Sequence, residues 1–171
     1  AAVLLSDNGD QFFQELFSHG ATKIYNIIDP KLAHYQNDYY AKAISDLIAK
    51  DRPEIMLYGA TTTGRSVAPT VAVMINTGLT ADCTEFDYDV ENKLLLQTRP
   101  AFGGNIMATI ITPDHKPQMA TARPNVYPKI KVDKESGEVI NITPDLSGVK
   151  DRMRLKETTK EAADEIDLTA A

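Results

Sequence analysis

An arginine followed by two glycines lies between two strand-like runs near the middle of the chain. Arg99 offers a permanent charge and a rigid fork of N–H donors, and Gly103 and Gly104 allow backbone conformations that other residues avoid. Together with Asn105, they predict a point where an aromatic ring or a phosphate approaches the backbone. The alternative is a bulged hairpin whose arginine binds a carbonyl oxygen. These residues alone leave both interpretations open.

A second candidate is the loop Gly59–Arg65, which joins an apolar strand to a helix. Backbone N–H groups and the helix dipole converge at such a loop, so Thr61, Thr62, Gly64 and Arg65 are candidate contacts for a phosphate or a flavin. The loop lacks the terminal Gly-Lys-Ser/Thr of the Walker pattern and the three spaced glycines of the dinucleotide fingerprint. The alternative is a threonine-capped turn between strand and helix, with Arg65 on the surface.

Asp82, Cys83 and Thr84 begin a later strand and are expected near the same end of the sheet as the threonine loop. A catalytic thiolate needs a base, and none of the three histidines has a reason to approach Cys83, so we interpret it as a small core residue. The chain has no Gly-x-Ser-x-Gly elbow, which argues against a serine hydrolase. It also has no Cys-x-x-Cys pair, and no metal site is predicted.

The composition is that of one ordinary globular domain. The 171 residues are 43% hydrophobic and 25% charged, and the net charge of -6 argues against binding to nucleic acid or to an anionic membrane surface. No apolar run reaches the roughly 20 residues of a membrane helix, and the start lacks the features of a signal peptide. The lone cysteine fits a reducing compartment, and we expect a cytoplasmic protein.

The first half alternates strands and helices, which predicts a mostly parallel sheet with covering helices. The expected strands are 3–5, 22–28 and 55–58, and the expected helices are 11–19, 37–50 and 66–77. Residues 55–58 form a nearly continuous apolar run, which is typical of a strand that is covered on both faces.

After Gly78 the pattern changes to short strands separated by turns, with no helix between them. The expected strands are 82–88, 93–99, 105–112 and 118–123. They predict a mostly antiparallel meander that extends the parallel half into a mixed sheet. From about residue 128 the chain is polar, with a hairpin expected around 134–137. We interpret residues 129–171 as an arm or linker, and residues 1–128 as the domain.

Four motifs, in order and at matching spacing, resemble the alpha subunit of electron transfer flavoproteins. They are Gly59-Ala60-Thr61-x-x-Gly64-Arg65, then 77–84, then 99–108, then Pro117-Gln118-Met119-Ala120-Thr121-x-Arg123-Pro124. Their richer glycine and proline content is similar to the anaerobic, electron-bifurcating bacterial branch.

The resemblance implies an adenine nucleotide alpha hydrolase-like three-layer α/β fold. It implies a heterodimer with a beta subunit, and electron transfer between flavins and a flavin-dependent dehydrogenase, for example one acting on acyl-CoA or lactate. In bifurcating relatives the FAD of the beta subunit lies against the alpha subunit, whose Arg-Pro-x-x-Gly-Gly arginine reaches the flavin N5 region. That role corresponds to Arg99. The Gly59–Arg65 loop and residues 82–84 are candidates for lining the same interface.

Two departures from the family pattern are expected to matter. The family's C-terminal domain, which carries its own FAD, is not found in this sequence, and the first strand and helix of the family fold also have no counterpart. We therefore interpret the chain as the base domain of an electron transfer flavoprotein alpha subunit. The alternatives are a purely structural heterodimerisation domain without flavin contact, and a nucleotide-binding stress-type domain.

Overall fold

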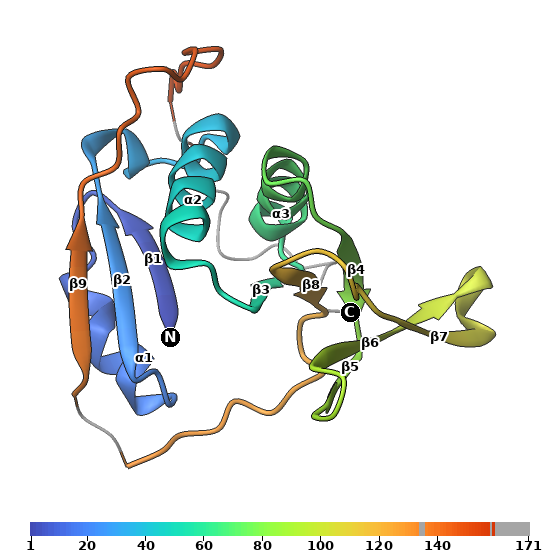
Figure 1. The fold of residues 1–171 in the computed structure, drawn as a ribbon. Coiled ribbons are helices and arrows are strands. Elements are labelled where there is room, and N and C mark those ends of the chain that lie inside the picture. The colour runs from blue at the N-terminus through green and yellow to red at the C-terminus, as the bar shows by residue number, and fades with distance from the viewer. Residues whose placement is uncertain (134–135, 158, 160–171) are drawn as a thin grey trace.

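The computed structural model describes residues 1–133, 136–157 and 159, and it forms an α/β fold (Figure 1). The helices are α1 (Phe13–Ser18), α2 (Asn37–Asp51) and α3 (Thr62–Met74), with 3-10 turns η1 (Asp10–Phe12), η2 (Pro30–Leu32) and η3 (Phe102–Gly104). The strands are β1 (Ala2–Ser6), β2 (Lys23–Ile28), β3 (Ile55–Gly59), β4 (Leu79–Cys83), β5 (Glu85–Asp89), β6 (Leu94–Ala101), β7 (Ile106–Ile110), β8 (Gln118–Ala122) and β9 (Glu138–Ile142).

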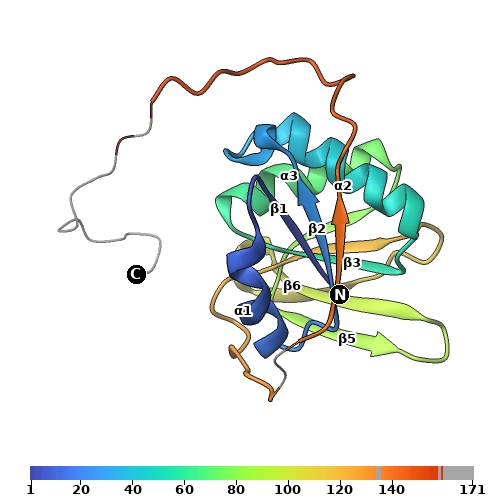
Figure 2. The same ribbon diagram turned by 90° about the vertical axis from the view of Figure 1, so that its left-hand side faces the viewer.

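The strands form three sheets of three strands each within the described residues. The first has the order β1-β2-β9 and the second the order β3-β8-β4, and every pairing in these two sheets is parallel. Figures 1 and 2 show α2 and α3 side by side over these strands, with α1 against the β1-β2-β9 sheet and away from both. The carboxyl ends of β3, β8 and β4 therefore lie at one edge.

The core lies between the helices and the parallel strands. One cluster packs Tyr39, Ala43 and Leu47 of α2 against Tyr25 and Ile27 of β2. The other packs α2 against α3 and the central strand β8, where Ile44, Val71 and Met119 are almost fully buried. Residues three and four apart share a helix face, so α2 serves both clusters with adjacent faces. Within the described residues, no helix is both long and apolar enough to cross a bilayer.

The third sheet, β5-β6-β7, is antiparallel and is attached to β8 by buried polar contacts. The Gln118 side chain accepts a hydrogen bond from the Leu95 N–H at 2.8 Å and donates one to the Lys93 carbonyl at 3.1 Å. At the other end, the Thr84 N–H donates to the Thr98 carbonyl at 2.9 Å. These bonds hold β6 against the parallel strands.

The α/β class is confirmed, but the expected four-strand meander is wrong in two respects. The predicted strand 82–88 is two strands. β4 ends at Cys83, with a left-handed φ of 62° at Asp82 and a register shift against β8 between Thr80 and Cys83, and β5 begins at Glu85. The predicted strand 118–123 belongs to the parallel sheet as β8. Gln118, Met119, Ala120 and Thr121 are all buried, as expected for a central parallel strand with both faces covered.

The helix boundaries differ from the prediction most clearly at α3. It begins at Thr62, four residues before the expected Ser66, because the Thr61 hydroxyl accepts a hydrogen bond from the Gly64 N–H at 3.2 Å and caps the helix. It ends at Met74, before the expected Thr77, since Asn76 takes a left-handed φ of 55° and Thr77 N–H bonds back to the Ala72 carbonyl.

Part of the predicted polar arm contributes to the sheet. Residues 134 and 135 of the expected hairpin lie outside the described residues, but Glu138–Ile142 form β9, parallel to β2, and Leu146 is buried. A Cβ atom at Gly137 would lie 2.6 Å from both Phe17 and the Thr22 carbonyl, so only glycine fits this entry into the sheet. The polar composition did not indicate this strand, and the division of the chain at residue 128 stays a prediction.

Strands β1 and β3 face each other across a groove of about 540 Å³, lined by Val3, Leu5, Met56 and Tyr58 among others. Each strand is the last of its sheet, so the groove lies between two unpaired strand edges. Leu57 of β3 is 48% exposed, although the sequence predicted a strand covered on both faces. The expectation that the family's first strand is lacking stays a prediction.

Candidate functional site

The candidate site is the edge where β3, β8 and β4 end. The Ala60 N–H donates to the Ala122 carbonyl at 2.7 Å, and the Arg123 N–H donates to the Cys83 carbonyl at 2.8 Å. These bonds continue the sheet one residue beyond the strands and bring three loops together. In open α/β sheets, ligands bind outside the carboxyl ends of the strands, so this edge is the candidate ligand site.

Asp82 joins two arginines at this edge. Its Oδ2 accepts from Arg123 Nη2 at 2.7 Å and from Nε at 3.2 Å, and its Oδ1 accepts from Arg65 Nη2 at 3.3 Å. The hydrogen bonds from Arg123, together with the charges of Arg123, Arg65 and Arg99, hold the pKa of Asp82 below its usual value despite partial burial. The Asp82 N–H is also fixed, because it donates to Thr121 Oγ1 at 2.8 Å.

The residues of the threonine loop, Gly59–Arg65, contact one another. A Cβ atom at Gly64 would lie 1.8 Å from the Gly59 carbonyl oxygen, so the first turn of α3 packs directly on the end of β3. The Gly64 N–H is used by Thr61, as in the threonine-capped turn that the sequence left open. Arg65 Nε donates to the Ala60 carbonyl at 2.8 Å, which directs the guanidinium towards Asp82. The roles of Thr61, Thr62, Gly64 and Arg65 as ligand contacts stay predictions.

Cys83 packs inside the sheet. It is fully buried, its Sγ donates to the Thr80 carbonyl at 3.6 Å, and burial raises the pKa of its thiol. A buried thiol with a raised pKa is a poor nucleophile. Thr84 is different, because its Oγ1 is buried and has no hydrogen-bond partner among the described residues. That oxygen is available to a ligand or to a partner's polar group.

Arg99 lies on β6, where it pairs with Ala108 of β7, and it is half-buried. Its charge makes a small contribution to the lowered pKa of Asp82 and partly opposes the rise that burial causes in the pKa of Cys83. In the part of the chain that the structure describes, no ion pair involves Arg99. The edge therefore carries the half-buried cation Arg99 beside a cluster in which two arginines share the single carboxylate of Asp82.

The glycines after Arg99 do not join this cluster. The pairing of β6 with β7 continues without a bulge to Ala101 and Ile106, and Gly103 and Gly104 lie in the turn between them with φ of 70° and 92°. Nothing lies within 4 Å of a Cβ atom built at either glycine. The turn needs their left-handed conformations, and they and Asn105 stand at the tip of a projecting hairpin (Figure 1).

Sequence reasoning did not assign a role to Arg123. Its position directly after a strand was visible, but that strand was expected in an antiparallel meander. Placing 118–122 in the parallel sheet brings Arg123 to the same edge as Asp82. The sequence of β8, in which Gln118 and Thr121 accompany apolar residues, did not indicate that both of its faces are covered.

The fold and this edge define an α/β domain that gathers charged side chains at the carboxyl ends of parallel strands. The sequence profile described as "Electron transfer flavoprotein domain" matches residues 1–147. The chain belongs to the electron transfer flavoprotein family.

Named relatives agree with this assignment. The chain is 52% identical over 132 residues to "Electron transfer flavoprotein subunit alpha" of Clostridium acetobutylicum, a match that covers 77% of this chain and 39% of the relative. It is 47% identical over 171 residues to the protein of the same name from Thermoanaerobacterium thermosaccharolyticum, with coverage of 99% and 52%. It is 44% identical over 170 residues to "Protein FixB" of Clostridium saccharobutylicum, with coverage of 99% and 51%. The chain thus spans about half the length of these relatives.

Proposed function

We propose that this chain is the base domain of an electron transfer flavoprotein alpha subunit, and that its carboxyl edge forms one wall of an FAD site held mainly by a beta-type partner subunit. Membership of a flavoprotein family supports the flavin, and names such as "Acryloyl-CoA reductase electron transfer subunit beta", given to a relative from Anaerotignum propionicum, support a multi-subunit electron carrier. The complex passes electrons to or from a flavin-dependent dehydrogenase.

The observation that carries the proposal is the half-buried Arg99, which forms no ion pair within the described residues. A permanent cation beside a flavin ring stabilises the anionic reduced form relative to the oxidised form. At an effective dielectric of about 20 and a separation of about 5 Å, one such charge contributes roughly 3 kcal/mol, which for a two-electron couple is on the order of tens of mV. The FAD supplies the redox chemistry when it is bound, and Arg99 tunes it.

The other residues of the edge fit this arrangement. Asp82, Arg65 and Arg123 would support the surface on which the ring rests. Asp82 holds both of these arginines in place, whereas Arg99 forms no ion pair among the described residues. The buried Thr84 Oγ1 can donate to or accept from a polar atom of the cofactor. The turn at Gly64 packs against the Gly59 carbonyl and leaves no space for a phosphate. We therefore assign the binding of the FAD pyrophosphate to the partner subunit.

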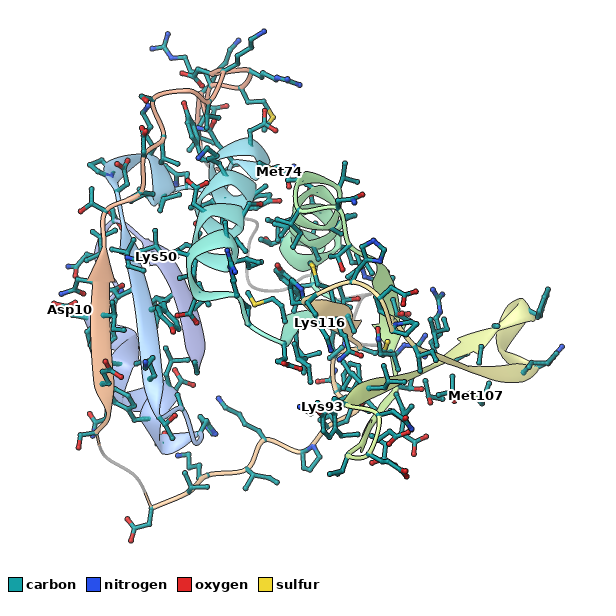
Figure 3. The ribbon with its side chains drawn as sticks, in the orientation of Figure 1. Asp10, Lys50, Met74, Lys93, Met107 and Lys116 are labelled. Atoms are coloured by element: carbon teal, nitrogen blue, oxygen red, sulfur yellow. The ribbon has the colours of Figure 1, made fainter. Side chains whose placement is uncertain are left out.

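The test replaces Arg99 by Ala and by Lys in the assembled complex and measures flavin midpoint potentials by spectroelectrochemistry. Arg99→Ala should lower the potential of one flavin by tens of mV, because it removes the stabilising cation, and Arg99→Lys should restore part of the shift. Lys50→Ala is the matched control, since Lys50 is an exposed cation on α2, well away from β6 (Figure 3).

Potentials that stay unchanged in a correctly assembled Arg99→Ala complex would overturn the flavin-wall role. The chain would then be a purely structural heterodimerisation domain, which is the competing function. Loss of FAD together with loss of the partner subunit would point to assembly instead of tuning, so subunit stoichiometry is measured on each sample.

A further inference from the structure

The hairpin formed by β6 and β7 carries an uncharged segment, residues 100–113, which we call the arm. A quarter of the chain is charged, yet no Asp, Glu, Lys or Arg occurs between Pro100 and Pro113. The arm projects from the body of the molecule on the side away from the β1-β2-β9 sheet (Figure 1). Depletion of charge together with aromatic and Met side chains is the composition of the buried centre of a protein interface.

The arm is exposed on both faces. Ile106 and Met107 are neighbours in β7 and so point to opposite sides of the strand, and they are 54% and 53% exposed. Figure 3 shows Met107 on this hairpin, far from α2 and α3. Strand β7 is also the last strand of its sheet, so one edge of its backbone is unpaired. A flat partner surface would cover one face only, whereas this geometry fits a concave surface.

Phe102 stands at the tip in a conformation that phenylalanine rarely adopts. Its φ is 48° and its side chain is 84% exposed, so little packing among the described residues offsets the strained backbone. Bulky residues with a left-handed φ are uncommon, and such strain concentrates at functional sites. Large aromatic side chains are also the commonest anchors at interface centres.

We propose that the arm inserts into an apolar cleft of the partner subunit, with Phe102 as its anchor. This inference rests on the proposed function for the existence of that subunit. The arm begins immediately after Arg99, so an inserted arm would carry Arg99 to the partner's cofactor site. The groove of this chain at α2 and the end of α3 combines apolar residues such as Ile48, Met74 and Ile75 with four charged residues, Lys42, Asp46, Arg52 and Lys116. An uncharged arm from a second copy would leave these charges without partners there.

Two substitutions separate docking from folding. Phe102→Gly removes the anchor and places glycine at a left-handed position, so it should raise the melting temperature of the chain purified without its partner while weakening assembly. Met107→Lys places a charge on one face of the arm. The matched control is Val73→Ala, because Val73 is an exposed apolar residue, 81% accessible, on α3.

Association of the purified subunits is measured by isothermal titration calorimetry. We expect Phe102→Gly and Met107→Lys each to weaken binding by about 30-fold or more, the size of an interface hot spot, and Val73→Ala to leave it unchanged. Wild-type affinity in both arm variants would overturn the inference. Self-association of the wild-type chain alone that Phe102→Gly abolishes would also overturn it, in favour of a second copy.

The outcome is independent of the flavin test. Weakened association in the arm variants with unchanged potentials in Arg99→Ala would leave the docking arm standing and refute the flavin wall. Shifted potentials in Arg99→Ala with wild-type association of the arm variants would do the reverse.

Discussion

Replacing Asp82 by Asn tests whether the ion cluster at the carboxyl edge stabilises the fold. Asn keeps the shape of the side chain and tolerates the left-handed φ of 62°, so the substitution removes little except the charge. The wild-type carboxylate, 22% exposed, accepts two hydrogen bonds from Arg123 and one from Arg65. Both arginines are partly exposed, so each pair is worth about 0.2–1 kcal/mol, and we expect a total loss of about 0.4–2 kcal/mol at pH 7.

The expected loss depends on pH in a defined direction. The hydrogen bonds from Arg123 and the charges of the arginines lower the pKa of Asp82 in the folded chain. A lowered pKa contributes stability that is fully present above the ordinary Asp value of about 3.9 and disappears as the pH falls through the folded-state value. The difference between wild type and Asp82→Asn should therefore be constant from pH 7 to about pH 5 and shrink below about pH 4.

The assay is urea unfolding followed by circular dichroism at several pH values, with the melting temperature as a second measurement. For a chain of this size the expected loss corresponds to about 1–8 °C. Asp114→Asn is the control, because Asp114 lies on an exposed bend. A destabilisation by Asp82→Asn that persists unchanged at pH 3 would refute the reasoning, since it would have to come from packing or backbone conformation.

Two further predictions concern the parallel sheets. Gly64→Ala should destabilise the chain by more than about 3 kcal/mol, because its Cβ atom would lie 1.8 Å from the Gly59 carbonyl oxygen. The control Gly148→Ala should change stability little, since nothing among the described residues lies within 4 Å of its Cβ position. Urea unfolding compares the free energies of unfolding of the two variants. In hydrogen exchange, amides of β1 and β3 that face the groove between them should exchange faster than amides of the central strands β2 and β8, and equal protection would show that another strand pairs there.

Local sequence patterns predicted most of the elements, because short-range periodicity and capping determine them. Residues close together in the sequence determine the apolar face of α2, the apolar strand β2 and the turn at Gly20. Strand partners depend on distant residues instead. The alternation of polar and apolar residues in β8 fits a parallel or an antiparallel neighbour equally well, and the pairing with β3 and β4, which are distant in sequence, decides where the strand lies.

The same distinction governs the site. Arg65 and Asp82 were both candidates from their own motifs, and the parallel arrangement of β3 and β4 brings them into contact. Arg123 could not be assigned without the correct partner for β8. The glycines of the arm were predicted from the conformations that they allow, which is a local property, and the structure gives both a positive φ. The length of β6 sets their distance from the Asp82 cluster, and no local sequence pattern predicts that distance.

The groove between β1 and β3 shows a local sequence pattern whose expected contacts depend on distant residues. The sequence of Ile55–Tyr58 is apolar throughout, a pattern typical of a strand with covered faces, yet Leu57 is 48% exposed and β3 has a neighbour on one side only. Tyr58 lines this groove, and its hydroxyl is buried without a partner among the described residues, while burial raises its pKa. The apolar run in β3 is therefore a local signal for contacts that the described residues only partly supply.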